Sequence, residues 1–224
     1  MPDMPDLQTI PPKKSTQRHI EIIAVVIIAL ATISSAWCVY EAAIWSGKQT
    51  FTLNEASALR AESVRVTTMA NTHALYDMNL FQAWLEASSQ NQTIKAEFYR
   101  SRFTKDFQPA FNAWIASVGP DTPVPADTPF DRPEYQLSES RAINQYMNDS
   151  EAAIDRARGY NQISDNYVLN TVLFALVLFL AGISTRWKSK EIEKGLLVLA
   201  IVIFIMAFGM MLTQPVSFTY QLNV

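Results

Sequence analysis

The sequence predicts an all-α integral membrane protein with three transmembrane helices and an antiparallel helical bundle outside the membrane between the first and second. Three segments of about 19 residues, 22–40, 167–185 and 195–213, contain no charged residue. Each is long enough to cross a hydrocarbon core about 30 Å thick. With a single cysteine and a polar stretch long enough for one small domain, the chain is neither a soluble enzyme, a disordered protein nor a disulfide-stapled secreted module.

The first span is predicted to be an uncleaved anchor that follows a cytoplasmic tail, residues 1–21. Its start resembles a signal peptide, because Lys13, Lys14 and Arg18 precede the apolar run and small residues occupy 34–36. The apolar run nevertheless continues to residue 40, whereas the apolar region of a signal peptide has roughly 7–15 residues.

Small side chains in and just after this span predict a packing face for another helix. They recur at intervals of seven and four residues, which places them on one side of a helix. The residues are Ala24, Ala31, Ser35, Ala42 and Ser46. The lone Cys38 lies at membrane depth, and we expect a buried thiol there.

The external domain, residues 41–166, is predicted to be helical because proline and glycine are nearly absent from its first half. Two alternatives remain at Gly47: the first helix ends there and a capping box at 52–55 starts the next one, or a single helix continues from residue 41 to residue 87. A polar turn at 88–93 precedes a helix at 94–118, kinked or restarted at Pro109. The proline-rich 119–133 is a loop, after which a last helix runs without a break into the second span.

The distribution of basic residues predicts the topology. The inner side would carry seven Lys and Arg residues close to the membrane, against four on the outer side. The seven are Lys13, Lys14, Arg18, Arg186, Lys188, Lys190 and Lys194. The N-terminus and the short loop 186–194 would then be cytoplasmic, and the helical domain and the tail 214–224 external. In a bacterium this membrane would be the inner membrane.

Aromatic residues at the ends of the spans match the belt that anchors proteins at a membrane surface. The predicted anchors are Trp37, Tyr40, Trp45, Tyr167 and Trp187.

Signs of catalysis are weak. His73 and Asp77, one helical turn apart, are the best metal candidates, but the external domain has no second histidine to complete a zinc site. The chain has no Gly-x-Ser-x-Gly motif, its glycines are scattered, and no ionisable residue lies within the three spans. We therefore expect no enzymatic activity, no cofactor and, with a net charge of -3, no nucleic-acid partner.

These observations favour a membrane protein that assembles with copies of itself or with a membrane-protein partner through its helical domain. One alternative is a membrane-tethered sensory or ligand-binding module. Its candidate ligand surface is the aromatic and basic stretch Phe98, Tyr99, Arg100, Arg102 and Phe103. Another is an oligomeric channel lined by the first span, with Ser35 facing the pore.

Overall fold

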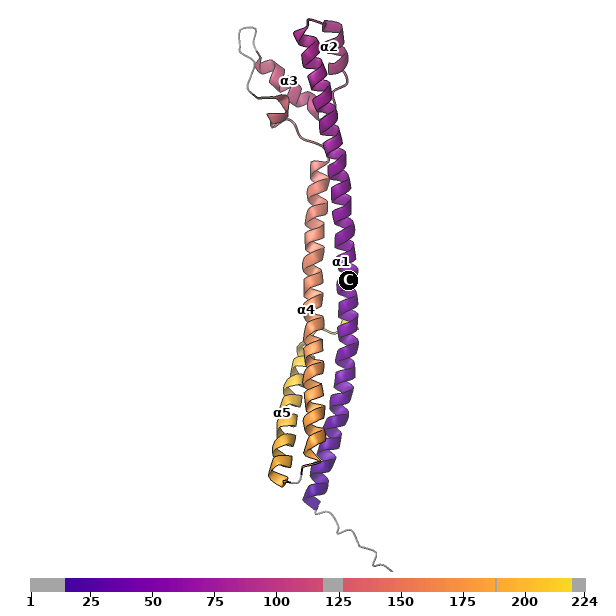
Figure 1. Ribbon diagram of the computed structural model, residues 1–224, viewed down its shortest axis with the longest axis vertical. Coiled ribbons are helices and arrows are strands. Elements are labelled where there is room, and N and C mark those ends of the chain that lie inside the picture. Colours follow the sequence, from indigo (N-terminus) through magenta and orange to yellow (C-terminus); the bar gives the residue numbers. More distant parts are fainter. Residues whose placement is uncertain (1–14, 119–126, 188, 219–224) are drawn as a thin grey trace, which may run out of the picture. The chain divides into compact units, whose positions relative to one another are not determined.

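The protein is helical throughout the part of the chain that the structure describes. The computed structural model describes residues 15–118, 127–187 and 189–218, with side chains from residue 19 onward. These residues form five α-helices and one 3-10 helix, with no strand among them (Figure 1). The elements are α1 Ser15–Ser89, α2 Thr93–Arg100, α3 Phe107–Ser117, η1 Pro129–Asp131, α4 Ser140–Ser184 and α5 Lys190–Thr213. The predicted all-α class is confirmed for these residues.

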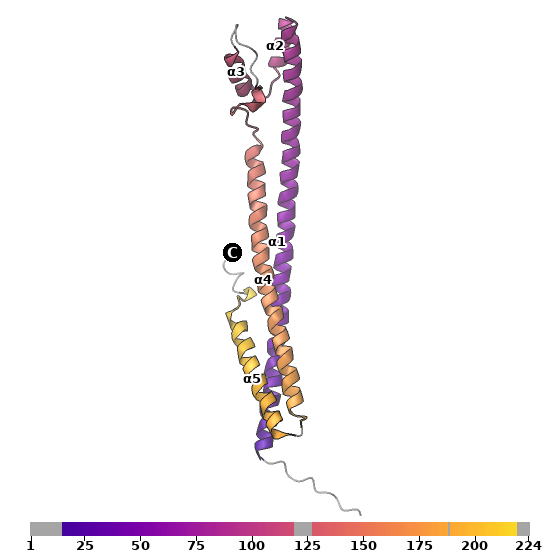
Figure 2. The same cartoon turned by 60° about the vertical axis from the view of Figure 1, so that its left-hand side comes forward.

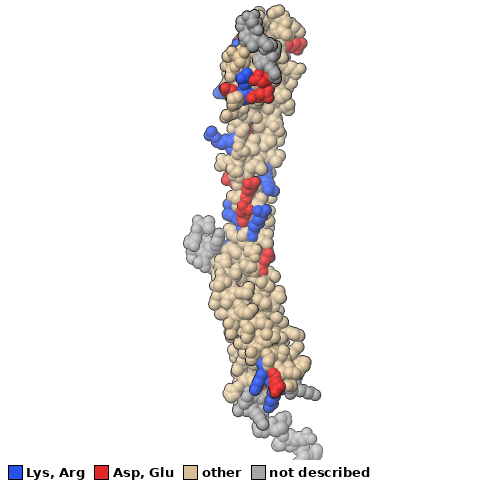
Figure 3. All heavy atoms as spheres, turned by 90° about the vertical axis from the view of Figure 1, so that its left-hand side faces the viewer, with Lys and Arg blue, Asp and Glu red and all other residues tan. Residues whose placement is uncertain are grey.

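Three of the helices, α1, α4 and α5, are long and apolar enough to cross a membrane. They contain the predicted spans except for Thr185, which follows the end of α4, and α5 begins five residues before the third span. The charged residues of α5 all lie between 190 and 194. On the face shown in Figure 3, charged side chains accordingly gather where α5 begins, and uncharged residues cover the rest of that helix.

The chain divides into two compact units, and α1 and α4 each contribute to both. The first unit contains residues 1–51 and 156–224, and the second contains residues 52–155. The predicted tail 1–21 lies outside the described residues as far as residue 14, and α1 has already begun at Ser15.

Of the two alternatives at Gly47, the structure shows the continuous helix, because α1 is a single helix of 75 residues. Gly47 is exposed in the helix interior, where a glycine costs about 1 kcal/mol relative to alanine. The buried residues Ala42 and Trp45 pack the helix in the turn just before this weak point. The proposed capping box at 52–55 is helix interior for the same reason.

The turn after α1 is confirmed, but the next helix is divided at a different place than predicted. α1 ends at Ser89, and Asn91 adopts a left-handed conformation with φ of 56°, which asparagine tolerates well. α2 then ends at Arg100 and α3 begins at Phe107, two residues before Pro109. The proline lies in the first turn of α3, where a missing N–H removes no helical hydrogen bond. Of the predicted loop 119–133, residues 119–126 lie outside the described residues.

Small residues let the helices of the first unit pack closely. Figures 1 and 2 both show α4 beside α1, and α5 beside α4. The Ser164 hydroxyl of α4 donates to the Ala42 carbonyl of α1 over 3.0 Å, so the two backbones lie close together. The buried core combines Ala31 and Cys38 of α1 with larger residues of α4 and with alanines of α5. Cys38 is buried, as predicted.

Aromatic residues form the core of the second unit. Phe103, Phe107, Phe111 and Trp114 are buried, and Phe81 of α1 packs edge-on to Trp114 with ring centroids 5.5 Å apart. Edge-to-face pairs of this kind contribute beyond the apolar area that they bury. A bond of 3.1 Å from the Ser150 hydroxyl to the Ala56 carbonyl joins α4 to α1 within this unit.

Candidate functional site

A fully buried carboxylate, Glu41, lies on α1 one residue beyond the first charge-free segment. The backbone N–H of Ser217, in the chain after α5, donates to Glu41 Oε2 over 2.9 Å, and the Ser217 hydroxyl donates to Oε1 over 3.0 Å. The indole Nε1–H of Trp45 donates to Oε2 over 3.2 Å. Three donors from two parts of the chain thus compensate the burial of one acidic group.

Trp45 connects this carboxylate to α4 and to a basic residue. Its ring is fully buried and lies 5.6 Å from the ring of Tyr160, centroid to centroid. The Lys48 ammonium lies 4.4 Å from the centre of the indole, which is a cation–π distance. The tryptophan therefore binds the carboxylate with its N–H and the ammonium with its face.

Two residues of α4 hold the same segment after α5. The Tyr167 hydroxyl donates to the Pro215 carbonyl over 3.3 Å, and the Asn166 amide donates to Gln214 Oε1 over 3.1 Å. Together with Glu41, they attach residues 214–217 to both α1 and α4. These hydrogen bonds fix the chain after α5. We call this set of bonds the latch.

Asn170 lies one turn beyond Tyr167 on α4 and is also fully buried. Neither its Oδ1 nor its Nδ2 atom has a hydrogen-bond partner within the described residues. A buried amide without partners is unfavourable by roughly 1–3 kcal/mol, so this position is a weak point in the packing of the first unit.

The predicted metal candidates are engaged with other groups of the second unit. His73 Nδ1 lies 2.7 Å from Glu139 Oε1. Asp77 accepts the Thr104 hydroxyl over 2.6 Å and the Thr104 backbone N–H over 3.2 Å. Among the described residues, no group of three His, Cys, Asp or Glu side chains could hold a metal ion.

Acidic groups and burial shift two pKa values in this part of the second unit. Burial raises the pKa of the Asp77 carboxyl, an effect that the two bonds from Thr104 oppose. Burial also raises the pKa of the Tyr135 phenol to about 12, and the nearby carboxylates of Asp77, Asp106 and Glu139 add to this shift. Asp106 in turn accepts the backbone N–H of Ser138 over 2.8 Å, just before α4.

The predicted packing face of the first span is used largely within the chain itself. Ala24, Ala31 and Ala42 are buried, Ser35 is partly buried and Ser46 is exposed. The three alanines are therefore covered by the protein's own helices. Ser35 is not a freely exposed position of the kind that the channel alternative would place in a pore.

The predicted interfacial aromatics fall into two groups. Trp37, Tyr40 and Trp187 are exposed and can contact lipid headgroups. Trp45 and Tyr167 are fully buried instead, because their polar atoms bond to Glu41 and to Pro215 inside the unit.

Of the residues predicted to set the topology, Arg186, Lys190 and Lys194 are exposed near the start of α5. Lys13, Lys14, Lys188 and the side chain of Arg18 lie outside the described residues.

The aromatic and basic stretch around α2 is divided between core and surface. Phe103 is buried in the aromatic core, whereas Phe98 is exposed and lies 3.7 Å beneath the Arg102 guanidinium. Arg100 stacks on Phe111 at 5.5 Å. These cations are thus satisfied by aromatic rings of the protein itself.

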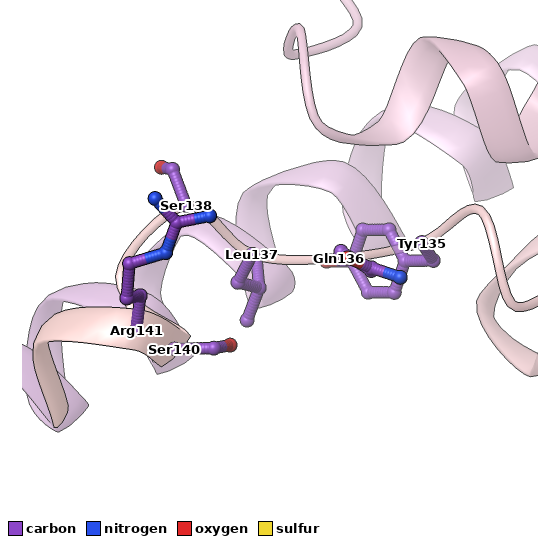
Figure 4. A pocket seen from close by; sticks show the side chains of 6 residues that line it. All are labelled: Tyr135, Gln136, Leu137, Ser138, Ser140 and Arg141. Atoms are coloured by element: carbon purple, nitrogen blue, oxygen red, sulfur yellow. The ribbon is translucent and has the colours of Figure 1, made fainter. Parts of the chain in front are cut away.

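A hollow of about 600 Å³ follows the linker between η1 and α4, and Figure 4 shows its lining. All its residues belong to one segment, 135–141, with Tyr135 and Gln136 at one end and Ser138 and Arg141 at the other. Among the described residues, only this linker and the adjoining first residues of α4 line the hollow, so it is a bend of the chain and not a built site.

No protein-family model, curated protein or solved structure matches this chain. The groups described above therefore have to be interpreted from their own chemistry.

Sequence reasoning missed Glu41 as a buried polar residue. A signal for Glu41 existed, because it lies three residues after Cys38 and four before Trp45, on the same side of the helix as both. Its partner Ser217 lies 176 residues away in a segment predicted to be a tail, so no local pattern could identify the pair.

Proposed function

We propose that this protein is a membrane-anchored assembly protein whose external helical bundle binds a second copy of the chain. Its three apolar helices would cross the membrane, with the N-terminus and the loop 186–194 on the cytoplasmic side. The second unit would lie outside, which in a bacterium is the periplasm. The excess of Lys and Arg at 13–18 and 186–194 supports this orientation.

The observation that carries the proposal is an apolar stripe on α1 that the second unit leaves exposed. The stripe consists of Leu53, Val64, Leu75, Met78 and Leu85, all of them exposed. The first three are spaced by 11 residues, which is about three helical turns, so they lie along one side of the helix. Between Leu53 and Leu85, Arg60 is the only charged residue on that side of the helix. The other residues on that side are small or uncharged.

A second copy fits this stripe better than an unrelated partner. Copies anchored in one membrane present the same residues at the same height, so Val64 and Leu75 of one copy can meet the same residues of another in a parallel, twofold arrangement. Burying such a stripe between parallel helices is the usual way in which coiled-coil and bundle proteins associate.

The proposal is tested by placing a charge in the stripe and, as a matched control, on the neighbouring residue. Leu75 is 59% exposed and Tyr76 is 48% exposed, but they point about 100° apart around the helix. Leu75→Asp should convert the oligomer to the monomer in native mass spectrometry or light scattering of the detergent-solubilised protein. Tyr76→Asp should leave the oligomer intact. A monomeric wild-type protein, or equal effects of the two variants, contradicts the proposal.

A second candidate function is ligand binding by the same unit. A hollow of about 550 Å³ lies between α1 and the segment around η1, with Phe81, Phe130 and Tyr135 in its lining. This volume is within the range of small-molecule pockets, and an aromatic lining suits an apolar ligand. A rise in thermal stability with one member of a metabolite panel, lost in Phe130→Ala, supports this candidate. A flat response across the panel opposes it.

A further inference from the structure

A groove lies between α1 and the start of α5, and its lining is suited to a lipid. Ile20 and Ile23 of α1 line one wall, and Val198 and Ile201 of α5 line the other. The groove has a volume of about 670 Å³, and its polar residues, His19 and Lys194, are the first lining residues of their helices. It is therefore apolar along most of its length and polar at one end. All of these residues belong to the first unit.

If the apolar helices cross a membrane as proposed, the position of the groove determines what covers it. The inference therefore rests on the proposed membrane insertion. Val198 is 60% exposed and Ile23 is also exposed, so the protein itself leaves both walls open. From Lys194 to Ile201 the groove follows α5 for about 10 Å, at 1.5 Å per residue. A lipid acyl chain is the apolar material available along this length of a membrane helix.

The charge at the polar end favours an anionic headgroup. Lys194 is the residue with a permanent charge among the described residues that line the groove, and none of these lining residues is acidic. Glu191 and Glu193 lie in the first turn of α5 but do not line the groove, whereas Lys194 does. Basic groups at the mouth of a pocket between membrane helices bind lipid phosphates, and each adds to the attraction of an anionic membrane surface.

We propose that this groove binds an anionic phospholipid, with one acyl chain between Ile23 and Val198 and the phosphate at Lys194. The lipid would join the starts of α1 and α5 on the side of the membrane that carries the basic loop. Selectivity for an anionic headgroup would come from Lys194, and affinity for any phospholipid would come from the apolar walls.

Native mass spectrometry of the full-length protein in detergent, titrated separately with phosphatidylglycerol and phosphatidylcholine, tests this site. The wild type should retain phosphatidylglycerol about fivefold better, which corresponds to one basic side chain near an anionic group. Lys194→Ala should abolish this preference, whereas Arg186→Ala, an equal loss of charge on an exposed residue outside the groove, should preserve it.

A second pair of variants tests the apolar walls. Val198→Trp fills the groove and should reduce retention of both lipids severalfold. Leu199→Trp adds the same bulk to a neighbouring residue that is 48% exposed and outside the groove, and should change neither. Equal retention of the two lipids by the wild type, or equal effects within either pair, overturns the site. A protein that is soluble without detergent would instead overturn the proposed membrane insertion.

Discussion

The strongest prediction concerns Glu41, whose replacement should release the chain after α5. Glu41→Ala leaves three buried donors without their acceptor: the indole N–H of Trp45 and both the N–H and the hydroxyl of Ser217. Each unsatisfied donor is unfavourable by about 1–3 kcal/mol, although partial hydration of the freed segment reduces the sum. We therefore expect a loss of about 3–5 kcal/mol in the free energy of unfolding, which is less than the full sum of the three penalties.

Two smaller changes at the same contact measure how much of this free energy comes from individual groups. Glu41→Gln keeps the size of the side chain and one acceptor oxygen, but it replaces the other oxygen with an NH2 group that faces the donors of Trp45 and Ser217. This variant should lose about 1–3 kcal/mol in the free energy of unfolding. Ser217→Ala removes only the hydroxyl bond and should lose about 1–2 kcal/mol. Because both act on one contact, the double variant should lose less than the sum of the single losses.

Unfolding by a denaturing detergent in mixed micelles, followed by tryptophan fluorescence, measures these energies. Hydrogen exchange at the Ser217 amide adds a local measurement, since this N–H is protected by Glu41. Glu86→Ala, on an exposed part of α1, serves as the control and should remain within about 0.5 kcal/mol of the wild type. If Glu41→Ala matched that control both in stability and in exchange at Ser217, the latch would be refuted.

Two further predictions address the continuity of α1 and the buried acid of the second unit. Gly47→Ala should stabilise the protein by about 0.5–1 kcal/mol in the same unfolding assay, because a Cβ at Gly47 meets no atom within 4 Å; a loss of stability would indicate a break there. The raised pKa of Asp77 means that the folded state binds a proton more tightly than the unfolded state, so the free energy of unfolding falls as the pH rises from about 4 through the raised pKa. Asp77→Asn should remove this dependence, and an unchanged pH profile of unfolding would contradict the assignment.

Long-range composition predicted the helical architecture well, because it depends on sums over many residues. The charge-free segments became parts of α1, α4 and α5, and the proline-free tract before the second span became the continuous α4. The same approach left open whether a single glycine would break the first helix. Gly47 did not interrupt α1, since the packing of Ala42 and Trp45 outweighs a propensity difference of about 1 kcal/mol. Conversely, the segment 101–106, which separates α2 from α3, contains neither proline nor glycine.

The candidate site was harder to predict because its groups are brought together by the tertiary structure. The burial of Glu41 depends on Ser217, and that of Asp77 on Thr104, which lies 27 residues away across two helix ends. The sequence identified Asp77 as a possible metal ligand because of His73 one turn before it. Each of the two side chains instead bonds to a different element, His73 to Glu139 and Asp77 to Thr104.

The location of the small residues determines which surface the proposed self-association could use. A small-residue face on a membrane helix can bring two copies together only if it remains uncovered. Ala24, Ala31 and Ala42 are covered by the chain's own helices, so a second copy could reach them only by displacing that packing. The exposed apolar stripe on the part of α1 that belongs to the second unit needs no such displacement. Association through Leu75 and its neighbours is therefore favoured over association through the first span, and Leu75→Asp is the variant that separates the two.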